Sequence, residues 1–171
     1  MYREFFQLRE KPFELVPNPT YLYLSRGHRK ALSYLEYGIQ ERAGFTLLTG
    51  EVGSGKTTLL RMIIRKLGAR QRLAMVFNTR VSAAELLALI SEDFGITEAE
   101  RDKVTLLRGL HDFLVAENSA GNQPIVIIDE AQNLEADALE EIRLLSNLEL
   151  EQRKLLQIVL VGQPELKEIV S

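Results

Sequence analysis

The sequence predicts an α/β fold of three layers, in which helices cover both faces of a mainly parallel β-sheet. Short apolar runs alternate along the chain with longer stretches whose apolar residues recur at helical spacing. One run, at 125–128, is apolar at every position and suits a strand buried on both faces. Strands that alternate with helices in this way favour parallel pairing through crossover connections.

The first half of the core is expected to alternate helix and strand. Apolar residues recur on one side of 28–40, and the run SAAE at 82–85 is a capping-box signature for a helix that Gly95 closes. In chain order we expect a helix at 28–40, a strand at 45–49, a helix that follows residue 57 and stops near Gly68, a strand at 73–77 and a helix at 82–95.

The second half continues the alternation. After polar residues at 97–103 we expect a helix at 105–117, a loop at 118–124, a strand at 125–128, a helix at 136–149 and a strand at 155–161. Pro164 stands where another helix could begin, because proline fits the first helical position.

Composition places the chain among globular proteins and excludes several kinds of site. Its 171 residues suffice for one domain with a substantial core, which we assign to 1–171. The net charge of −3 does not favour nucleic acid or an anionic membrane as partner. Cysteine is absent, which excludes disulfides and thiolate metal sites. The sequence has no apolar run of membrane-spanning length and no signal-peptide core, so the cytoplasm is the expected compartment.

Residues 1–27 are expected to form an arm ahead of the α/β core at 28–171. Positions 1–24 hold six of the twelve aromatic residues and three of the five prolines. The prolines forbid a regular helix, and the aromatic rings need a surface to pack on, so we predict an extended segment lying on the domain. Covering the core is the favoured role, and a contribution to the edge of an adenine pocket is the alternative.

Eight residues after the strand at 45–49 match a phosphate-binding P-loop. The run Gly50-Glu51-Val52-Gly53-Ser54-Gly55-Lys56-Thr57 fits G-x-x-x-x-G-K-[ST]. Its glycines let the backbone turn tightly and aim N–H groups at phosphate oxygens, and the helix behind adds its positive end. Lys56 can reach the β- and γ-phosphates, and the Thr57 hydroxyl can bind Mg²⁺. A glycine-rich turn with a solvated lysine is the alternative, but it leaves the strand–loop–helix context unexplained.

Two acidic residues follow the buried strand at 125–128. Asp129 and Glu130 stand at its carboxyl end, where ligands bind in open α/β sheets. Asp129 can hold Mg²⁺ while Lys56 and Thr57 contact the phosphates. Glu130 can accept a proton from an attacking water, or orient that water. An acidic pair at a helix N-terminus is the structural alternative, and the P-loop upstream favours the functional interpretation.

Three amide side chains near the strand ends have two interpretations each. If the strand at 155–161 lies between the strands at 45–49 and 125–128, Gln163 would reach the γ-phosphate or the attacking water and could sense nucleotide state. Otherwise it is a turn residue. Gln132 and Asn133 could support the carboxylate of Glu130, or could be exposed polar residues at a helix start, which we favour.

The separated motifs together resemble the AAA+ ATPases of the general secretion pathway A type. The matching runs are EVGSGKTTLLR at 51–61, DEAQNL at 129–134, RLLSNLE at 143–149, LVGQPEL at 160–166 and, in the arm, FEL at 13–15 and YLYLS at 21–25. They cover essentially the whole chain.

The resemblance implies an AAA+ core with strand order 5-1-4-3-2, ATP and Mg²⁺ as ligands, and nucleotide-driven assembly into a homo-oligomer. It also implies that Gly50 to Thr58 bind ATP, with Lys56 and Thr58 among the contacts. Asp129 and Glu130 correspond to the Walker B pair, and Gln163 to the sensor-1 region.

The family continues beyond the point that corresponds to Ser171, with a fifth strand, an arginine finger, a helical lid and, in many members, a membrane segment. We therefore expect a core truncated before the lid, with one edge of the strand at 45–49 left open. An arginine finger contributes about 10³- to 10⁵-fold in rate, so this chain should bind nucleotide and hydrolyse it slowly. A membrane segment in the full-length protein would hold it at the cytoplasmic face of the membrane.

Three functions are compatible with the sequence. The first is ATP hydrolysis that energises or switches a secretion or envelope-assembly complex. The second is a nucleotide-gated interaction module without efficient turnover. The third is a DNA-associated ATPase that helps transposition or initiation, for which the basic residues between Arg61 and Arg72 are the local support. We favour a solvated helix face for that cluster, and hydrolysis in secretion for the chain.

Overall fold

The computed structural model describes residues 24–97 and 102–170, so most of the arm predicted at 1–27 lies outside the described residues. Within the described ranges, no helix combines the length and the apolar character needed to cross a membrane. The elements are α2 (Arg26–Gln40), β1 (Phe45–Thr49), α3 (Lys56–Lys66), β2 (Gln71–Val76), α4 (Ala83–Asp93), α5 (Lys103–Ser119), β3 (Gln123–Ile128), the 3-10 turn η2 (Ala131–Asn133), α6 (Ala136–Ser146), β4 (Glu149–Leu150), β5 (Arg153–Lys154), β6 (Gln157–Gly162) and α7 (Leu166–Ile169).

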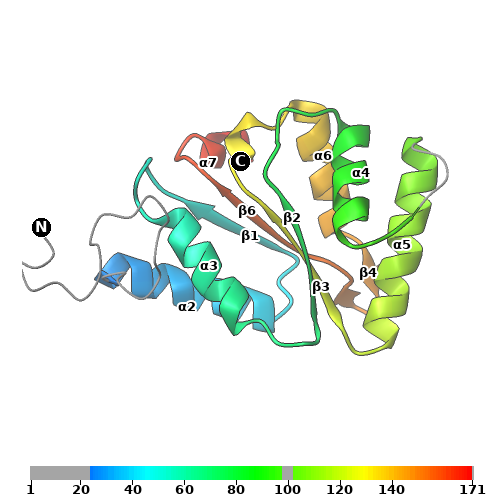
Figure 1. Ribbon diagram of the computed structural model, residues 1–171, viewed down its shortest axis with the longest axis horizontal. Coiled ribbons are helices and arrows are strands. Elements are labelled where there is room, and N and C mark those ends of the chain that lie inside the picture. The colour runs from blue at the N-terminus through cyan, green and yellow to red at the C-terminus, as the bar shows by residue number, and fades with distance from the viewer. Residues whose placement is uncertain (1–23, 98–101, 171) are drawn as a thin grey trace, which may run out of the picture.

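Four strands form a parallel sheet in the order β1-β6-β3-β2 (Figure 1). The central strands β3 and β6 are buried along their whole length, which the apolar run at 125–128 predicted for β3. β6 lies between β1 and β3, which is the placement that the functional interpretation of Gln163 requires. The order agrees with that implied by the family resemblance, without the fifth strand. Among the described residues, one edge of β1 has no strand beside it.

Helices cover both faces of the sheet, and the alternation of side chains along the strands divides the core in two. Ile125 and Ile127 of β3 pack on the side of α2 and α3, whereas Val126 and Ile128 pack with α4, α5 and α6 (Figure 1). Each helix presents an apolar stripe to its side, as the helical spacing in the sequence predicted. The sheet is thus a rigid support for the loops at its ends.

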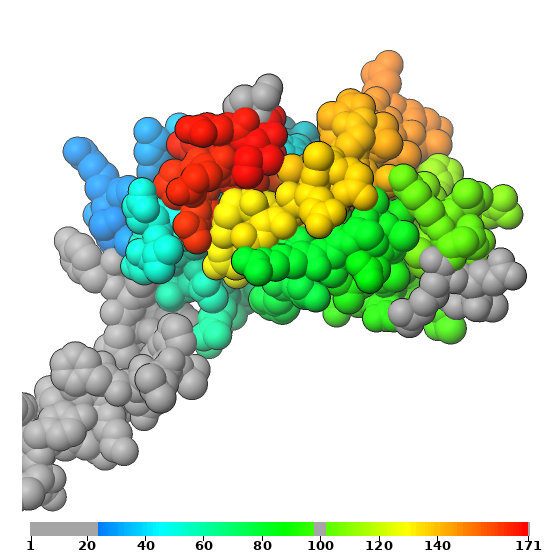
Figure 2. All heavy atoms as spheres, turned by 90° about the horizontal axis from the view of Figure 1, so that it is seen from above, coloured from blue at the N-terminus to red at the C-terminus, as the bar shows by residue number. Residues whose placement is uncertain are grey.

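The carboxyl ends of the four strands meet at one edge of the sheet. Figure 2 looks onto this edge, where the red atoms after β6 lie against the yellow atoms after β3 and border the cyan atoms near residue 50. Backbone hydrogen bonds continue the strand pairing into the loops. Gly50 N–H donates to the Gly162 carbonyl at 3.1 Å, and Asp129 N–H donates to the Val76 carbonyl at 3.0 Å.

One boundary differs from the prediction for an identifiable reason. Pro124 belongs to β3, although the sequence placed it in a loop. Gln123 N–H donates toward β2, to the Arg70 carbonyl, so the nitrogen of the next residue faces β6. Pairing with β6 begins only at Ile125, and the missing N–H of proline therefore costs no ladder bond. The last helix starts at Leu166, rather than at Pro164.

A short hairpin was not predicted. The helix expected at 136–149 ends at Ser146, and β4 and β5 follow as an antiparallel pair. Glu151 and Gln152 make the turn with φ angles of 50° and 64°. Turns of this kind usually contain Asn, Asp or Gly at such positions, so the composition of this segment does not indicate one.

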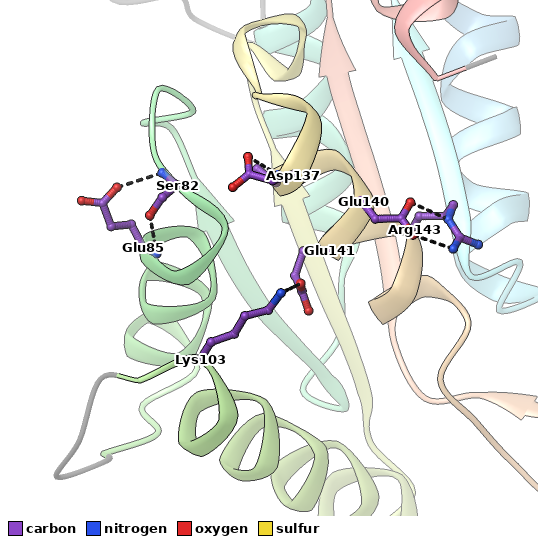
Figure 3. Close-up of polar contacts among 8 residues, drawn as sticks. Ser82, Glu85, Lys103, Asp137, Glu140, Glu141 and Arg143 are labelled. Atoms are coloured by element: carbon purple, nitrogen blue, oxygen red, sulfur yellow. Dashed lines mark hydrogen bonds and ion pairs between the residues drawn. The ribbon is translucent and has the colours of Figure 1, made fainter.

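An ion pair between the half-exposed Lys103 and the buried Glu141 joins α5 to α6. The side chain of Glu141 is only 3% exposed, and its carboxylate pairs with the ammonium of Lys103 (Figure 3). Without that partner the buried charge would be strongly destabilising. The pair therefore fixes the start of α5 against the helix that follows β3.

Candidate functional site

The predicted phosphate loop joins the end of β1 to the start of α3. Gly55 is the residue before α3 and has a φ of 88°, a left-handed conformation that favours glycine. No side chain caps the N-terminus of α3. Its first backbone N–H groups therefore remain available to an anion, and the helix dipole makes this end positive. This arrangement fits a bound phosphate group.

The ammonium of Lys56 lies over the loop from which it projects. Its Nζ donates to the carbonyls of Gly50 at 2.6 Å and Glu51 at 2.8 Å. These contacts hold the positive charge close to the loop. Phosphate oxygens would replace the carbonyls as the acceptors of these hydrogen bonds.

Asp129 is partly desolvated at the end of β3. Burial raises the pKa of its carboxyl group, and the negative charge of Glu130 raises it further. The Glu130 N–H, which donates to Asp129 Oδ1 at 2.9 Å, and the charge of Lys56 lower the same pKa. A half-buried carboxylate beside a second acid is suited to a divalent cation, which would offset the cost of its charge.

Glu130 has a strained backbone that another segment holds in place. Its φ is 52°, in the left-handed region that few residues other than glycine adopt. The hydroxyl of Thr79, a residue only 3% exposed, donates to the Glu130 carbonyl at 3.0 Å. The loop after β2 thus fixes the conformation in which the side chain of Glu130 leaves the end of β3.

The two amide residues after Glu130 have different contacts in the structure. Gln132 Nε2 donates to Glu130 Oε2 at 2.6 Å, and Gln132 Oε1 accepts from the Gln163 N–H at 3.1 Å. Gln132 therefore supports the carboxylate, and the favoured interpretation of it as an exposed polar residue was wrong. Asn133 is exposed, in agreement with that interpretation.

The other predicted residues lie around this centre. Thr57 and Thr58 are in the first turn of α3, and Gln163 follows the end of β6. Gly53 and Ser54 are exposed at the tip of the loop. The structure brings all three segments to the same edge of the sheet, and the roles of individual residues remain predictions.

His28 was not predicted as part of the site. It comes from the first turn of α2, and its Nε2 lies 2.7 Å from the carbonyl oxygen of Ser54. A carbonyl only accepts, so Nε2 is the donor in this contact, and Nδ1 lies 2.8 Å from the Ser25 hydroxyl on the other side of the ring. A Cβ on Gly55 would lie 3.1 Å from the same Nε2, so glycine also makes room for the ring.

We expect that replacing His28 with Ala weakens ATP binding about threefold to tenfold, because one hydrogen bond of about 1 kcal/mol no longer orders the loop. His28→Gln retains a donor and should recover part of the loss. The matched control is His111→Ala, which changes an exposed residue of α5. Calorimetric titration with ATP measures all three, and equal affinities for the His28 and His111 variants would contradict the expectation.

The comparison with protein families agrees with this fold. A family model described as an AAA domain matches residues 39–170, which is most of the chain. The chain belongs to this AAA domain family. Its fold is therefore that of an AAA+ P-loop NTPase, as the sequence motifs predicted.

The similar proteins include one named for a secretion pathway and one named for DNA transposition. The chain is 45% identical over 171 residues to "General secretion pathway protein A" of Aeromonas hydrophila, covering 99% of this chain and 31% of the relative. It is 32% identical over 132 residues to "Mu-like prophage FluMu DNA transposition protein B" of Haemophilus influenzae, covering 77% and 43%. The chain thus spans less than half the length of either relative. The first match agrees with the family resemblance found in the sequence.

Solved structures support the fold alone. The Orc2 protein of Aeropyrum pernix, in complexes with ADPNP and ADP, matches with a TM-score of 0.61 and 19% identity over 89% of this chain and 44% of that one. The Cdc6p of Pyrobaculum aerophilum matches with a TM-score of 0.61 and 19% identity, over 94% and 46%.

Proposed function

We propose that this chain binds ATP with Mg²⁺ and hydrolyses it, as the ATPase core of a secretion or envelope-assembly complex. The observation that carries the proposal is the meeting of two groups at one sheet edge. A phosphate loop with an uncapped helix N-terminus lies at the end of β1, and an acid pair, the half-buried Asp129 and the exposed Glu130, lies at the end of β3. The end of β6 links the two, because the Gly50 N–H donates to the Gly162 carbonyl, and the Gln163 N–H donates to Gln132, which in turn donates to Glu130.

In this proposal, the chain's own residues bind and orient the substrate. Backbone N–H groups of the loop and the ammonium of Lys56 hold the phosphates. Thr57 and Asp129 would hold Mg²⁺, which neutralises charge on the phosphate oxygens when bound. The desolvation of Asp129 supports this assignment, because a cation would relieve it.

Glu130 is the proposed general base. It would take a proton from the attacking water, while its backbone is held by Thr79 and its carboxylate by Gln132. Gln163 would contact the γ-phosphate or that water from the end of β6. Positioning of this kind supplies much of the rate in phosphoryl transfer.

Single-turnover phosphate release tests the enzymatic part of the proposal. With protein in excess over ATP, slow hydrolysis is still measurable, and we expect release that requires Mg²⁺. ATP binding without release would favour the nucleotide-gated interaction module instead. Absence of both binding and release would contradict either function.

The proposed role in secretion rests on the relative from Aeromonas hydrophila, whose name places it in the general secretion pathway. This part of the proposal predicts a partner among secretion or envelope proteins, and assembly of the full-length protein into a homo-oligomer. Capture of that partner by the chain loaded with a non-hydrolysable ATP analogue, and release with ADP, would support it. Capture that ignores the nucleotide would contradict a nucleotide-driven role.

A DNA-associated function is the second candidate, and the transposition relative favours it. The local charges favour it less. Lys66 pairs with Glu36, and Arg72 lies 3.6 Å from a carboxylate oxygen of Glu117, so part of the basic cluster is neutralised. Binding to duplex DNA that weakens steeply with salt would promote this candidate over the first.

A further inference from the structure

The side-chain amide of Gln132 bridges the segments that follow β3 and β6. Its nitrogen binds the first and its oxygen binds the second. Its Nε2 donates to Glu130 Oε2 at 2.6 Å, and its Oε1 accepts from the backbone N–H of Gln163 at 3.1 Å. A carboxylate can only accept and a backbone N–H can only donate. The amide satisfies both partners in one orientation alone, because turning it over would set acceptor against acceptor and donor against donor.

Glycine at the end of β6 makes room for this amide. A Cβ on Gly162, the last residue of β6, would lie 2.5 Å from Gln132 Oε1 and 2.9 Å from Leu166 Cδ2. Real side chains do not approach so closely, so glycine at this position is what lets the amide reach β6. Ala131 and Leu134, on either side of the amide residues, are buried in the core and fix the turn η2.

The same turn contacts the segment after β6. η2 contacts both β6 and α7, and Leu166 of α7 is buried in the same core. Gln163 stands between β6 and α7. The hydrogen bond from the Gln163 N–H to Gln132 Oε1 therefore connects this segment to the amide that also binds Glu130.

We propose that Gln132 is a positioning residue that couples the orientation of the Glu130 carboxylate to the backbone position of Gln163. Its consequence for catalysis rests on the proposed function, in which Glu130 is the base and Gln163 is near the γ-phosphate. A change in the contact between Gln163 and the γ-phosphate would then alter the orientation of the Glu130 carboxylate through the side chain of Gln132. The bridge itself depends only on the two hydrogen bonds.

The bridge is tested by the backbone amide signal of Gln163 in ¹H–¹⁵N NMR spectra of the whole chain, without nucleotide. Removing the carboxylate with Glu130→Ala should shift this signal when Gln132 is present. In the Gln132→Leu background the same change should leave the signal unmoved, because the connection is gone. An equal shift in both backgrounds would overturn the proposal, whether or not the chain hydrolyses ATP.

The consequence is tested by single-turnover hydrolysis. Gln132→Leu should slow the rate about 10- to 100-fold with ATP affinity unchanged, as expected for a misplaced base. In a Glu130→Gln background, Gln132→Leu should cause no further loss, whereas a merely structural role would lower the rates additively. Asn133→Ala, at the exposed neighbour, is the matched control and should hydrolyse at the unmodified rate.

Gln132→Glu keeps one of the two hydrogen bonds, removes the other and leaves the size of the side chain unchanged. It can still accept from Gln163, but it places a carboxylate against that of Glu130 instead of a donor. We expect a rate at least as low as that of Gln132→Leu. Full activity in Gln132→Glu would overturn the proposal. If the unmodified chain releases no phosphate while the NMR result holds, then the proposed function fails and the bridge stands.

Discussion

Replacing Glu130 with Gln should lower the rate of ATP hydrolysis about 10²- to 10⁴-fold and leave ATP affinity within about threefold of its original value. The amide has the same shape as the carboxylate and can accept a hydrogen bond from Gln132, so the positioning survives. What it loses is the ability to take a proton from water. Single-turnover phosphate release and calorimetric titration measure the two quantities separately.

The matched control for this change is Glu135→Gln. Glu135 is an exposed acid at the N-cap of α6 and makes no side-chain capping bond. It undergoes the same loss of charge a few residues from the site, and should hydrolyse ATP at the unmodified rate. Unchanged hydrolysis in the Glu130 variant would remove Glu130 from the role of base.

Replacing Lys56 with Ala should weaken ATP binding about 10- to 100-fold. Hydrogen bonds to a charged group contribute about 1.5–3 kcal/mol, and each 1.4 kcal/mol corresponds to a factor of ten. The ammonium donates to the carbonyls of Gly50 and Glu51. Both acceptors belong to the loop and not to the core, so the fold should persist.

Arg65→Ala is the control for Lys56→Ala, because it removes a positive charge from the exposed last turn of the same helix. It should leave the dissociation constant for ATP unchanged, while the Lys56 variant raises it. Circular dichroism of both variants checks that α3 remains folded. Equal affinities in the two variants would show that Lys56 does not contact the phosphates.

Local patterns in the sequence predicted most of the secondary structure because burial leaves a direct periodic signal. The strand at 45–49 has the predicted bounds, and the capping box at Ser82 forms as its residues indicated, with Ser82 and Glu85 bonded reciprocally (Figure 3). The order of the strands in the sheet has no such signal. It came from the family resemblance, since hydrophobic periodicity does not say which strands are neighbours.

Contacts between segments far apart in the sequence were not predictable in the same way. His28 reaches Ser54, and Thr79 reaches Glu130, as single polar residues without a pattern around them. Gln132 stood beside the acid pair, but its second partner lies at the end of another strand. The motifs identified the groups expected to do chemistry, and only the fold revealed the residues that hold them in place.

Calorimetric titration of the chain with ATP, in the presence and absence of Mg²⁺, tests the central claim most directly. If the phosphate loop and the acid pair bind one metal–nucleotide complex, then ATP binds at a single site and Mg²⁺ strengthens that binding. Asp129→Asn should abolish the strengthening and leave metal-free binding intact. The account is contradicted if ATP produces no heat of binding, or if Mg²⁺ strengthens binding equally in the Asp129 variant.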